Sequence, residues 1–208
     1  MHETVVGDRG EQLDDRLRKR NYALTKSLSK AKSSEKMIFI GPGEQERAYA
    51  RIQKELFSEA DELWLFDSYF TDRNHGNLQM LDWLRLITHA DTGEKHIVFY
   101  SRDEEHAYTA DGLRQLALSD PIIAEAIREK KQKLELIQTD EAIHDRFLIL
   151  KKEELYHGLS IGTSLNSLEH NFYMITQMEH AEAKSVVDRM ASWLQDHIHA
   201  REVCAHEI

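Results

Sequence analysis

Cysteine is nearly absent from this chain, since Cys204 is the only one among 208 residues. A single cysteine excludes a disulfide framework within one chain, and it excludes a zinc site built from several cysteines. Long apolar runs are also absent, and none reaches the roughly 18 residues that a membrane-spanning helix needs. Residues 1–10 are polar and do not resemble a secretory signal. We therefore expect a soluble, cytoplasmic protein.

Positive charge is in deficit, because 27 Lys and Arg residues face 37 Asp and Glu residues and the formal net charge is −10. A field of this sign repels nucleic acid and anionic membranes. A local basic groove remains compatible with it. Basic residues gather in two stretches, from Arg16 to Lys36 and from Arg128 to Lys133, and these are the candidate contacts with nucleic acid.

Residues 1–36 differ in composition from the rest of the chain. From residue 16 onward they contain eight basic residues and one acid, Glu35. Four leucines at helical spacing predict an amphipathic helix, followed by a serine-rich linker: Leu13, Leu17, Leu24 and Leu28. This helix either packs on the domain through its leucines or contacts nucleic acid or a second copy. We predict a basic helical extension over residues 1–36 and a domain over residues 37–208.

Short apolar runs alternate with stretches of helical periodicity in the predicted domain. The predicted strands are residues 37–40, 62–70, 96–100, 134–138, 142–150, 155–162 and 171–176. The predicted helices are residues 44–60, 78–88, 111–131 and 179–200, and Asp120-Pro121 marks either a break in the third or the first turn of a second helix there. This alternation predicts an α/β fold with a mixed, mostly parallel sheet and helices on both faces. The last strands are too close together for crossovers, so we expect them to pair antiparallel.

The most informative stretch is residues 143–150, where Ile143-His144-Asp145-Arg146 leads into an apolar run. In a strand, His144 and Arg146 project from one face and Asp145 from the other. A histidine and an arginine on one face can address one phosphate, because imidazole can attack phosphorus and guanidinium can hold its oxygens. The alternative is a histidine at the edge of the core, with Arg146 bridged to Asp145 or to a nearby glutamate.

A second polar run, residues 158–166, ends in Gly162-Thr163-Ser164-Leu165-Asn166. The side chains of Ser164 and Asn166 share one face of the predicted strand and turn. Hydroxyl, amide and backbone N–H groups are the neutral donors that an anionic phosphate needs. The alternative is an ordinary turn. If the two runs are neighbours in the sheet, their polar faces converge on one site.

Together the two runs resemble the signature of the phospholipase D superfamily, His-x-Lys-x4-Asp followed by Gly-Ser/Gly-x-Asn. His144 matches the nucleophilic histidine, and Arg146 stands where the family has lysine. Ser164 and Asn166 match the second part of the signature. Lys151 occupies the position of the family's aspartate, which normally orients the catalytic pair. Acids proposed to substitute for it are Glu153, Glu154 and Glu169.

The form HDRF…GTSLNSL also resembles compact phospholipase D-like modules of prokaryotic phage-defence and mobile-element proteins. The HDR tripeptide also resembles the corresponding motif in the C-terminal domain of MIT-domain proteins, a phospholipase D-like domain that binds membrane lipid. Such modules have an aromatic-rich strand that ends in Asp-x-Tyr-Phe. The resemblance therefore implies substrate-binding roles for Asp67, Tyr69, Thr163 and Glu169, although Asp67 alone also fits a cap at the end of a strand.

The resemblance implies a metal-independent phosphodiesterase without a cofactor. We expect a nuclease rather than a phospholipase, because no hydrophobic loop suited to a membrane is evident. Family members with one motif commonly form homodimers, in which two copies of His144 meet at one site. The alternative is an inactive module that binds nucleic acid, a lipid headgroup or a protein partner, and peripheral lipid contact stays open.

Overall fold

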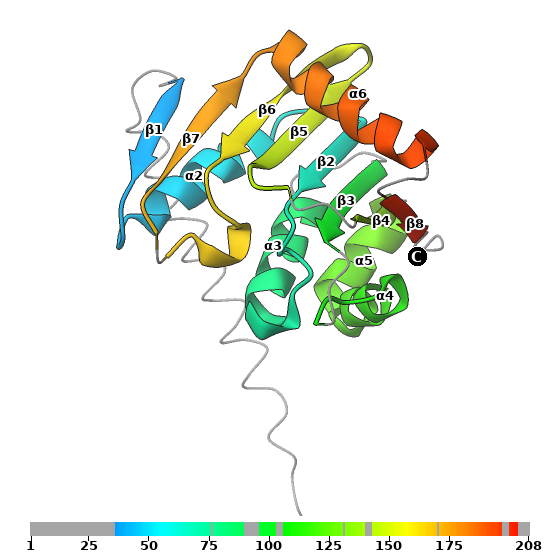
Figure 1. Cartoon of the computed structure of the whole chain (residues 1–208). Coiled ribbons are helices and arrows are strands. Elements are labelled where there is room, and N and C mark those ends of the chain that lie inside the picture. Colours follow the sequence, from blue (N-terminus) through cyan, green and yellow to red (C-terminus); the bar gives the residue numbers. More distant parts are fainter. Residues whose placement is uncertain are drawn as a thin grey trace, which may run out of the picture. The chain divides into compact units, whose positions relative to one another are not determined.

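A computed structural model describes residues 36–75, 77–89, 96–102, 106–130, 132–139, 143–169, 171–196 and 200–203. These residues fold around one eight-stranded sheet with helices on both faces (Figure 1). The prediction of an α/β fold with helices on both faces is therefore confirmed. The predicted basic extension lies outside the described residues, apart from Lys36.

The predicted strands and helices occur in the predicted order, with bounds that differ for all except β1, and one strand that was not predicted, β8, is added. The strands are β1 (Met37–Ile40), β2 (Glu62–Phe66), β3 (His96–Arg102), β4 (Lys133–Thr139), β5 (Arg146–Lys152), β6 (Leu155–Ile161), β7 (Tyr173–Met178) and β8 (Ala200–Val203). The helices are α2 (Gln45–Leu56), α3 (Asn77–His89), α4 (Ala110–Ser119), α5 (Pro121–Lys130) and α6 (His180–Asp196), with short 3₁₀ helices η1 (Arg73–His75) and η2 (Leu165–Ser167). Among the described residues, no helix is long and apolar enough to cross a lipid bilayer.

The strands lie in the order β1-β7-β6-β5-β2-β3-β4-β8, and most of their pairings are antiparallel. Only β2–β3 and β3–β4 are parallel within the described sheet. The prediction of a mostly parallel sheet is wrong, because β5 lies antiparallel beside β2 and the β5–β6–β7 meander continues from there to β1. The antiparallel pairing predicted for the last strands is confirmed.

Each face of the sheet has its own apolar cluster. Helices α2 to α5 cover one face, where Leu65 and Leu148 are fully buried. Helix α6 covers the other face, where Phe66 and Ile149 are fully buried beside Met190. Because β2 and β5 contribute alternate residues to both clusters, they form the buried centre of the sheet. Burial of side chains of this size contributes roughly 1.5–3 kcal/mol each.

Strands β2 and β5 place the candidate residues at one edge of the sheet. Strand β2 ends at Phe66, and residues 67–70 turn away from it instead of continuing the strand. Strand β5 begins at Arg146, whereas the sequence predicts a start at residue 142. In the register Phe66 lies opposite Phe147, so Asp67 and Arg146 stand just beyond the last pair.

Helix α5 begins at the break that Asp120-Pro121 predicts. The Oδ1 atom of Asp120 accepts hydrogen bonds from the backbone N–H groups of Ile122 and Ile123, at 3.0 and 3.1 Å. This is the arrangement of a helix N-cap, and Pro121 suits the first turn because its missing N–H needs no partner there. The two-helix interpretation of this stretch is therefore confirmed.

The described part of the basic stretch from Arg128 to Lys133 lies at the opposite end of the parallel strands from Asp67. Lys133 is opposite His96 in the register, and His96 is opposite Glu62, the first residue of β2. Within this stretch Gln132 is buried and donates a hydrogen bond to the carbonyl of Thr88. This stretch and the candidate phosphate-binding residues are therefore at separate edges.

Candidate functional site

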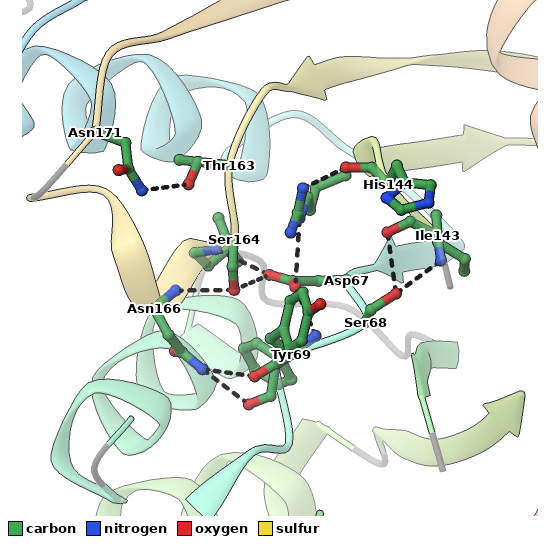
Figure 2. Close-up of polar contacts among 12 residues, drawn as sticks. Asp67, Ser68, Tyr69, Ile143, His144, Thr163, Ser164, Asn166 and Asn171 are labelled. Atoms are coloured by element: carbon green, nitrogen blue, oxygen red, sulfur yellow. Dashed lines mark hydrogen bonds and ion pairs between the residues drawn. The ribbon is translucent and has the colours of Figure 1, made fainter. Parts of the chain in front are cut away.

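The carboxylate of Asp67 is the centre of the candidate site. It follows the last residue of β2 and has no exposed surface. Its Oδ2 atom accepts hydrogen bonds from Ser164 Oγ and from the N–H of Leu165, each at 2.8 Å, and its Oδ1 atom accepts one from the N–H of Tyr69 at 3.0 Å (Figure 2). One side chain thereby joins the end of β2 to the turn that begins η2.

The guanidinium of Arg146 approaches Asp67 from the neighbouring strand. Its Nε atom lies 3.9 Å from Asp67 Oδ1, which is an ion-pair distance but too long for a hydrogen bond. The guanidinium lies over the ring of Tyr69, 5.5 Å from its centroid, and Nη1 donates a hydrogen bond to the backbone carbonyl of His144. The buried Nε has no hydrogen-bond partner among the described residues.

His144 lies just before β5, so the alternation of a strand does not set its direction. Its side chain is exposed, and no residue drawn in Figure 2 hydrogen bonds to its imidazole. Asp145 is exposed as well, and the ion pair of Arg146 is with Asp67 rather than with Asp145. An accessible imidazole and a half-buried guanidinium therefore stand two residues apart at this edge.

Ser68 fixes the residue that precedes His144. Its Oγ donates a hydrogen bond to the carbonyl of Ile143 at 3.0 Å and accepts one from the N–H of Ile143 at 2.9 Å. Both residues are buried, so the His144 segment is held against the end of β2. Sequence reasoning missed Ser68, because a serine in this turn gives no sign that its partner is 75 residues away.

The donors of Ser164 and Asn166 point into the protein. The hydroxyl of Ser164 binds Asp67, and Asn166 Nδ2 donates to the backbone carbonyls of Tyr69 and Phe70 at 3.0 and 3.2 Å (Figure 2). Both side chains are buried, with 2% and 5% exposure. The two polar runs of the sequence therefore meet at the end of β2, where these donors bind protein groups.

Thr163 and Glu169 lie on either side of η2. Thr163 is buried, and its hydroxyl oxygen accepts a hydrogen bond from Asn171 Nδ2 at 3.4 Å. Glu169 is exposed. The structure thus connects six of the predicted residues through direct contacts: Asp67, Tyr69, His144, Arg146, Ser164 and Asn166. Thr163 adjoins this group through the chain.

Lys151, at the position of the family's aspartate, lies at the far end of β5. Its Nζ is 2.6 Å from Glu62 Oε1 across the strand pair. Glu153 and Glu154 form the exposed turn that follows β5, at the same far end. Neither of these two acids is near Arg146 in the strand register. The acid that faces Arg146 is Asp67.

Burial has the largest influence on Asp67 and raises its pKa above the ordinary value of 3.8. The hydrogen bonds from Leu165, Tyr69 and Ser164 lower the pKa, and so does the positive charge of Arg146. A buried carboxyl group with opposed influences on its pKa, next to a cation, is typical of functional sites.

The chemistry available at this edge suits a phosphate ester. In open α/β sheets ligands bind beyond the carboxyl ends of strands, where β2 ends here. A guanidinium holds phosphate oxygens through charge-assisted hydrogen bonds, and an exposed imidazole can act as nucleophile or proton donor. Within the described ranges, no three His, Cys, Asp or Glu residues are grouped so that they could hold a metal ion.

Comparisons with known proteins give only distant likenesses. No family model and no curated protein matches the chain. Nuc from Salmonella typhimurium, a phospholipase D family member, is 11% identical, with 80% of this chain and 95% of that chain covered and a TM-score of 0.49. NucT from Helicobacter pylori is 12% identical, with 80% and 98% covered and a TM-score of 0.46.

The archaeal chromatin protein TrmBL2, whose structure shows a novel mode of DNA binding, is 14% identical to this chain. The structural alignment covers 95% of this chain and 68% of TrmBL2, with a TM-score of 0.44. With all three TM-scores below 0.5, these likenesses leave the family open. The function must be inferred from the site itself.

Proposed function

We propose that this protein is a phospholipase D-like phosphodiesterase that cleaves nucleic acid without a metal ion. The observation that carries the proposal is the half-buried guanidinium of Arg146, which pairs with Asp67 by charge without a hydrogen bond and lies beside the exposed His144. Arg146 would hold the oxygens of a phosphodiester, and His144 would supply the nucleophile. Ser164 and Asn166 would shape the site from inside by holding Asp67 and the turn at residues 69–70.

The proposed reaction has two steps. In the first, a ring nitrogen of His144 bonds to phosphorus, the bond from phosphorus to the leaving oxygen breaks, and that oxygen takes a proton from a second imidazole. In the second, water attacks the phosphohistidine, the N–P bond breaks, and the water proton returns to the second imidazole. The products are an alcohol and a phosphate monoester, and both histidines regain their starting states.

The second imidazole would come from His144 of another copy. The chain has a single HDR motif, so one chain offers one such histidine at the site. A two-fold axis beside the exposed His144 would bring two copies together, which is the arrangement that one motif per chain requires. We therefore propose a homodimer with a shared site.

A second candidate function is phosphate binding without turnover. The specific observation in its favour is that no described residue hydrogen bonds to the imidazole of His144, whereas catalytic histidines are generally oriented by a partner. Arg146 alone would then recognise a phosphate of a nucleic acid or of another ligand. This candidate predicts binding that survives His144→Ala and is lost in Arg146→Ala.

Cleavage assays separate the two candidates. Purified protein would be incubated in EDTA with single- and double-stranded DNA and RNA and with bis(p-nitrophenyl) phosphate. His144→Ala removes the proposed nucleophile, and His157→Ala is the matched control, because His157 lies on β6 outside the site. The phosphodiesterase predicts cleavage in EDTA that is lost only in His144→Ala. Absence of cleavage on every substrate contradicts it, and cleavage that persists in His144→Ala removes the proposed nucleophile.

A further inference from the structure

The buried carboxylate of Asp67 contacts both polar runs of the site. It accepts hydrogen bonds from Ser164 and Leu165 on one side and faces Arg146 on the other. An ionised carboxylate without exposed surface is costly unless donors and a cation surround it. Three hydrogen bonds supply the donors here, and Arg146 supplies the opposite charge without a hydrogen bond.

The 3.9 Å separation has a consequence for Arg146. A hydrogen-bonded pair would occupy the guanidinium donors, as the 2.6 Å contact between Lys151 and Glu62 occupies a donor of that lysine. At 3.9 Å the charge of Asp67 attracts Arg146, while the Nε–H keeps no partner among the described residues. Coulomb attraction persists at this distance in a buried setting, whereas a hydrogen bond does not.

We propose that Asp67 is the positioning residue of the site, which holds Arg146 in place by charge without a hydrogen bond, so that the exposed edge of the guanidinium can bind a phosphate oxygen. The inference rests on the proposed function, because it takes phosphate as the ligand of Arg146. Asp67 would act through Arg146 and the Ser164 turn without touching the substrate, since it has no exposed surface. It would thereby supply the acid that position 151 lacks.

The test replaces Asp67 with asparagine in the full chain. Asp67→Asn removes the charge and nearly preserves the shape, and Asp145→Asn is the matched control, because this exposed acid adjoins Arg146 in the chain. The readout is the Nε–H signal of Arg146 in a ¹H–¹⁵N NMR spectrum, first alone and then during titration with inorganic phosphate. Turnover of bis(p-nitrophenyl) phosphate is measured in parallel.

We expect Asp67→Asn to shift the Arg146 signal without phosphate. The variant should bind phosphate about ten-fold more tightly, because a negative charge near the anion is gone. Turnover should fall by about 100-fold, because the guanidinium loses its fixed orientation. Asp145→Asn should leave the Arg146 signal almost unchanged. This split between tighter binding and slower turnover distinguishes positioning from a merely structural role, which would lower thermal stability alone.

An Arg146 signal and a phosphate affinity that are the same in Asp67→Asn and the unmodified protein overturn the inference. The proposed function fails in a different way: the unmodified protein then neither binds phosphate at Arg146 nor cleaves a diester. The ligand-free Arg146 signal still reports on Asp67 in that case, so the two failures are distinguishable.

A second measurement covers the case in which Asp67→Asn does not fold. The pKa of the Asp67 carboxyl group is followed by ¹³C NMR in the unmodified protein and in Arg146→Gln. The charge of Arg146 lowers this pKa, so its removal should raise it. An Asp67 pKa that does not change on loss of the arginine overturns the inference.

Discussion

Ion pairs lie at both ends of the antiparallel pairing of β2 and β5, and two of them, Lys151–Glu62 and Arg146–Asp67, differ in distance and burial. At the far end Lys151 and Glu62 are 2.6 Å apart, and both side chains are about one quarter exposed (24% and 26%). At the site end Arg146 and Asp67 are 3.9 Å apart, and Asp67 is fully buried. The same two strands therefore hold a closed, solvated pair and an open, buried one.

The difference separates a pair on the surface from the pair to which we assign a role in the proposed function. A direct, partly exposed pair contributes about 0–1 kcal/mol to stability and can be exchanged at little cost. A buried pair that leaves a donor without a hydrogen bond is unfavourable for stability, and this cost supports the positioning role that we propose for Asp67. The position of the acid along the sequence matters less than the edge of the sheet on which it lies.

Removal of Arg146 should have the largest effect. Arg146→Ala takes away the guanidinium and leaves the Asp67 charge uncompensated, so we expect phosphodiester turnover to fall by about 100- to 1,000-fold. The matched control is Arg128→Ala, which removes a cation at the opposite edge and should change turnover less than about two-fold. Initial rates on bis(p-nitrophenyl) phosphate measure both. Equal rates for the two variants would contradict the claim that turnover depends on the cation at the site edge and not on the one at the opposite edge.

Loss of the two hydrogen bonds between Ser68 and the backbone of Ile143 should have the next largest effect. Ser68→Ala leaves the buried N–H and C=O of Ile143 without the serine hydroxyl, so we expect the free energy of unfolding to fall by about 1–3 kcal/mol. Urea denaturation measures it. Ser119→Ala is the control, because that exposed hydroxyl binds only the carbonyl of Leu116 and its loss should cost under about 0.5 kcal/mol. A Ser68→Ala protein as stable as the control would show that these two hydrogen bonds do not stabilise the fold.

Placing an aspartate at position 151, where the phospholipase D signature has one, should have the smallest effect on activity. Lys151→Asp places a carboxylate opposite Glu62, and like charges across a strand pair should destabilise the fold by about 1 kcal/mol. Because this end of β5 is remote from Arg146, turnover should remain within about two-fold of the unmodified protein. Thermal unfolding and initial rates check the two statements. A clear gain in activity would show that position 151 does support the site.

Local elements of the fold could be predicted from the sequence, whereas pairings between distant segments could not. Strand β1 has the predicted bounds, and the break at Asp120-Pro121 begins α5 as predicted. Strand β8 was missed, because residue 200 closes a stretch of helical periodicity and its pairing with β4 leaves no local signal. The prediction of a mostly parallel sheet was wrong because β5 pairs antiparallel with β2, and this pairing between distant segments leaves no local signal either.

Most residues of the candidate site could be predicted from the sequence, whereas their contacts with one another could not. The sequence motifs selected residues that lie together at one edge of the sheet, among them Asp67, Arg146 and Ser164. They gave no indication that Ser164 donates to Asp67, because that contact depends on how the turns at the ends of two separate strands meet. Nor did they suggest Ser68, whose partner is the backbone of Ile143 and therefore carries no side-chain signature.

The central claim is that His144 is the nucleophile beside Arg146, and a trapped intermediate tests it most directly. Protein mixed with a diester in EDTA would be quenched at alkaline pH, where phosphohistidine survives, and its peptides examined by mass spectrometry. The account predicts a phosphate adduct on His144 that is absent from Arg146→Ala. Cleavage without an adduct on His144, or an adduct on another residue, would contradict it.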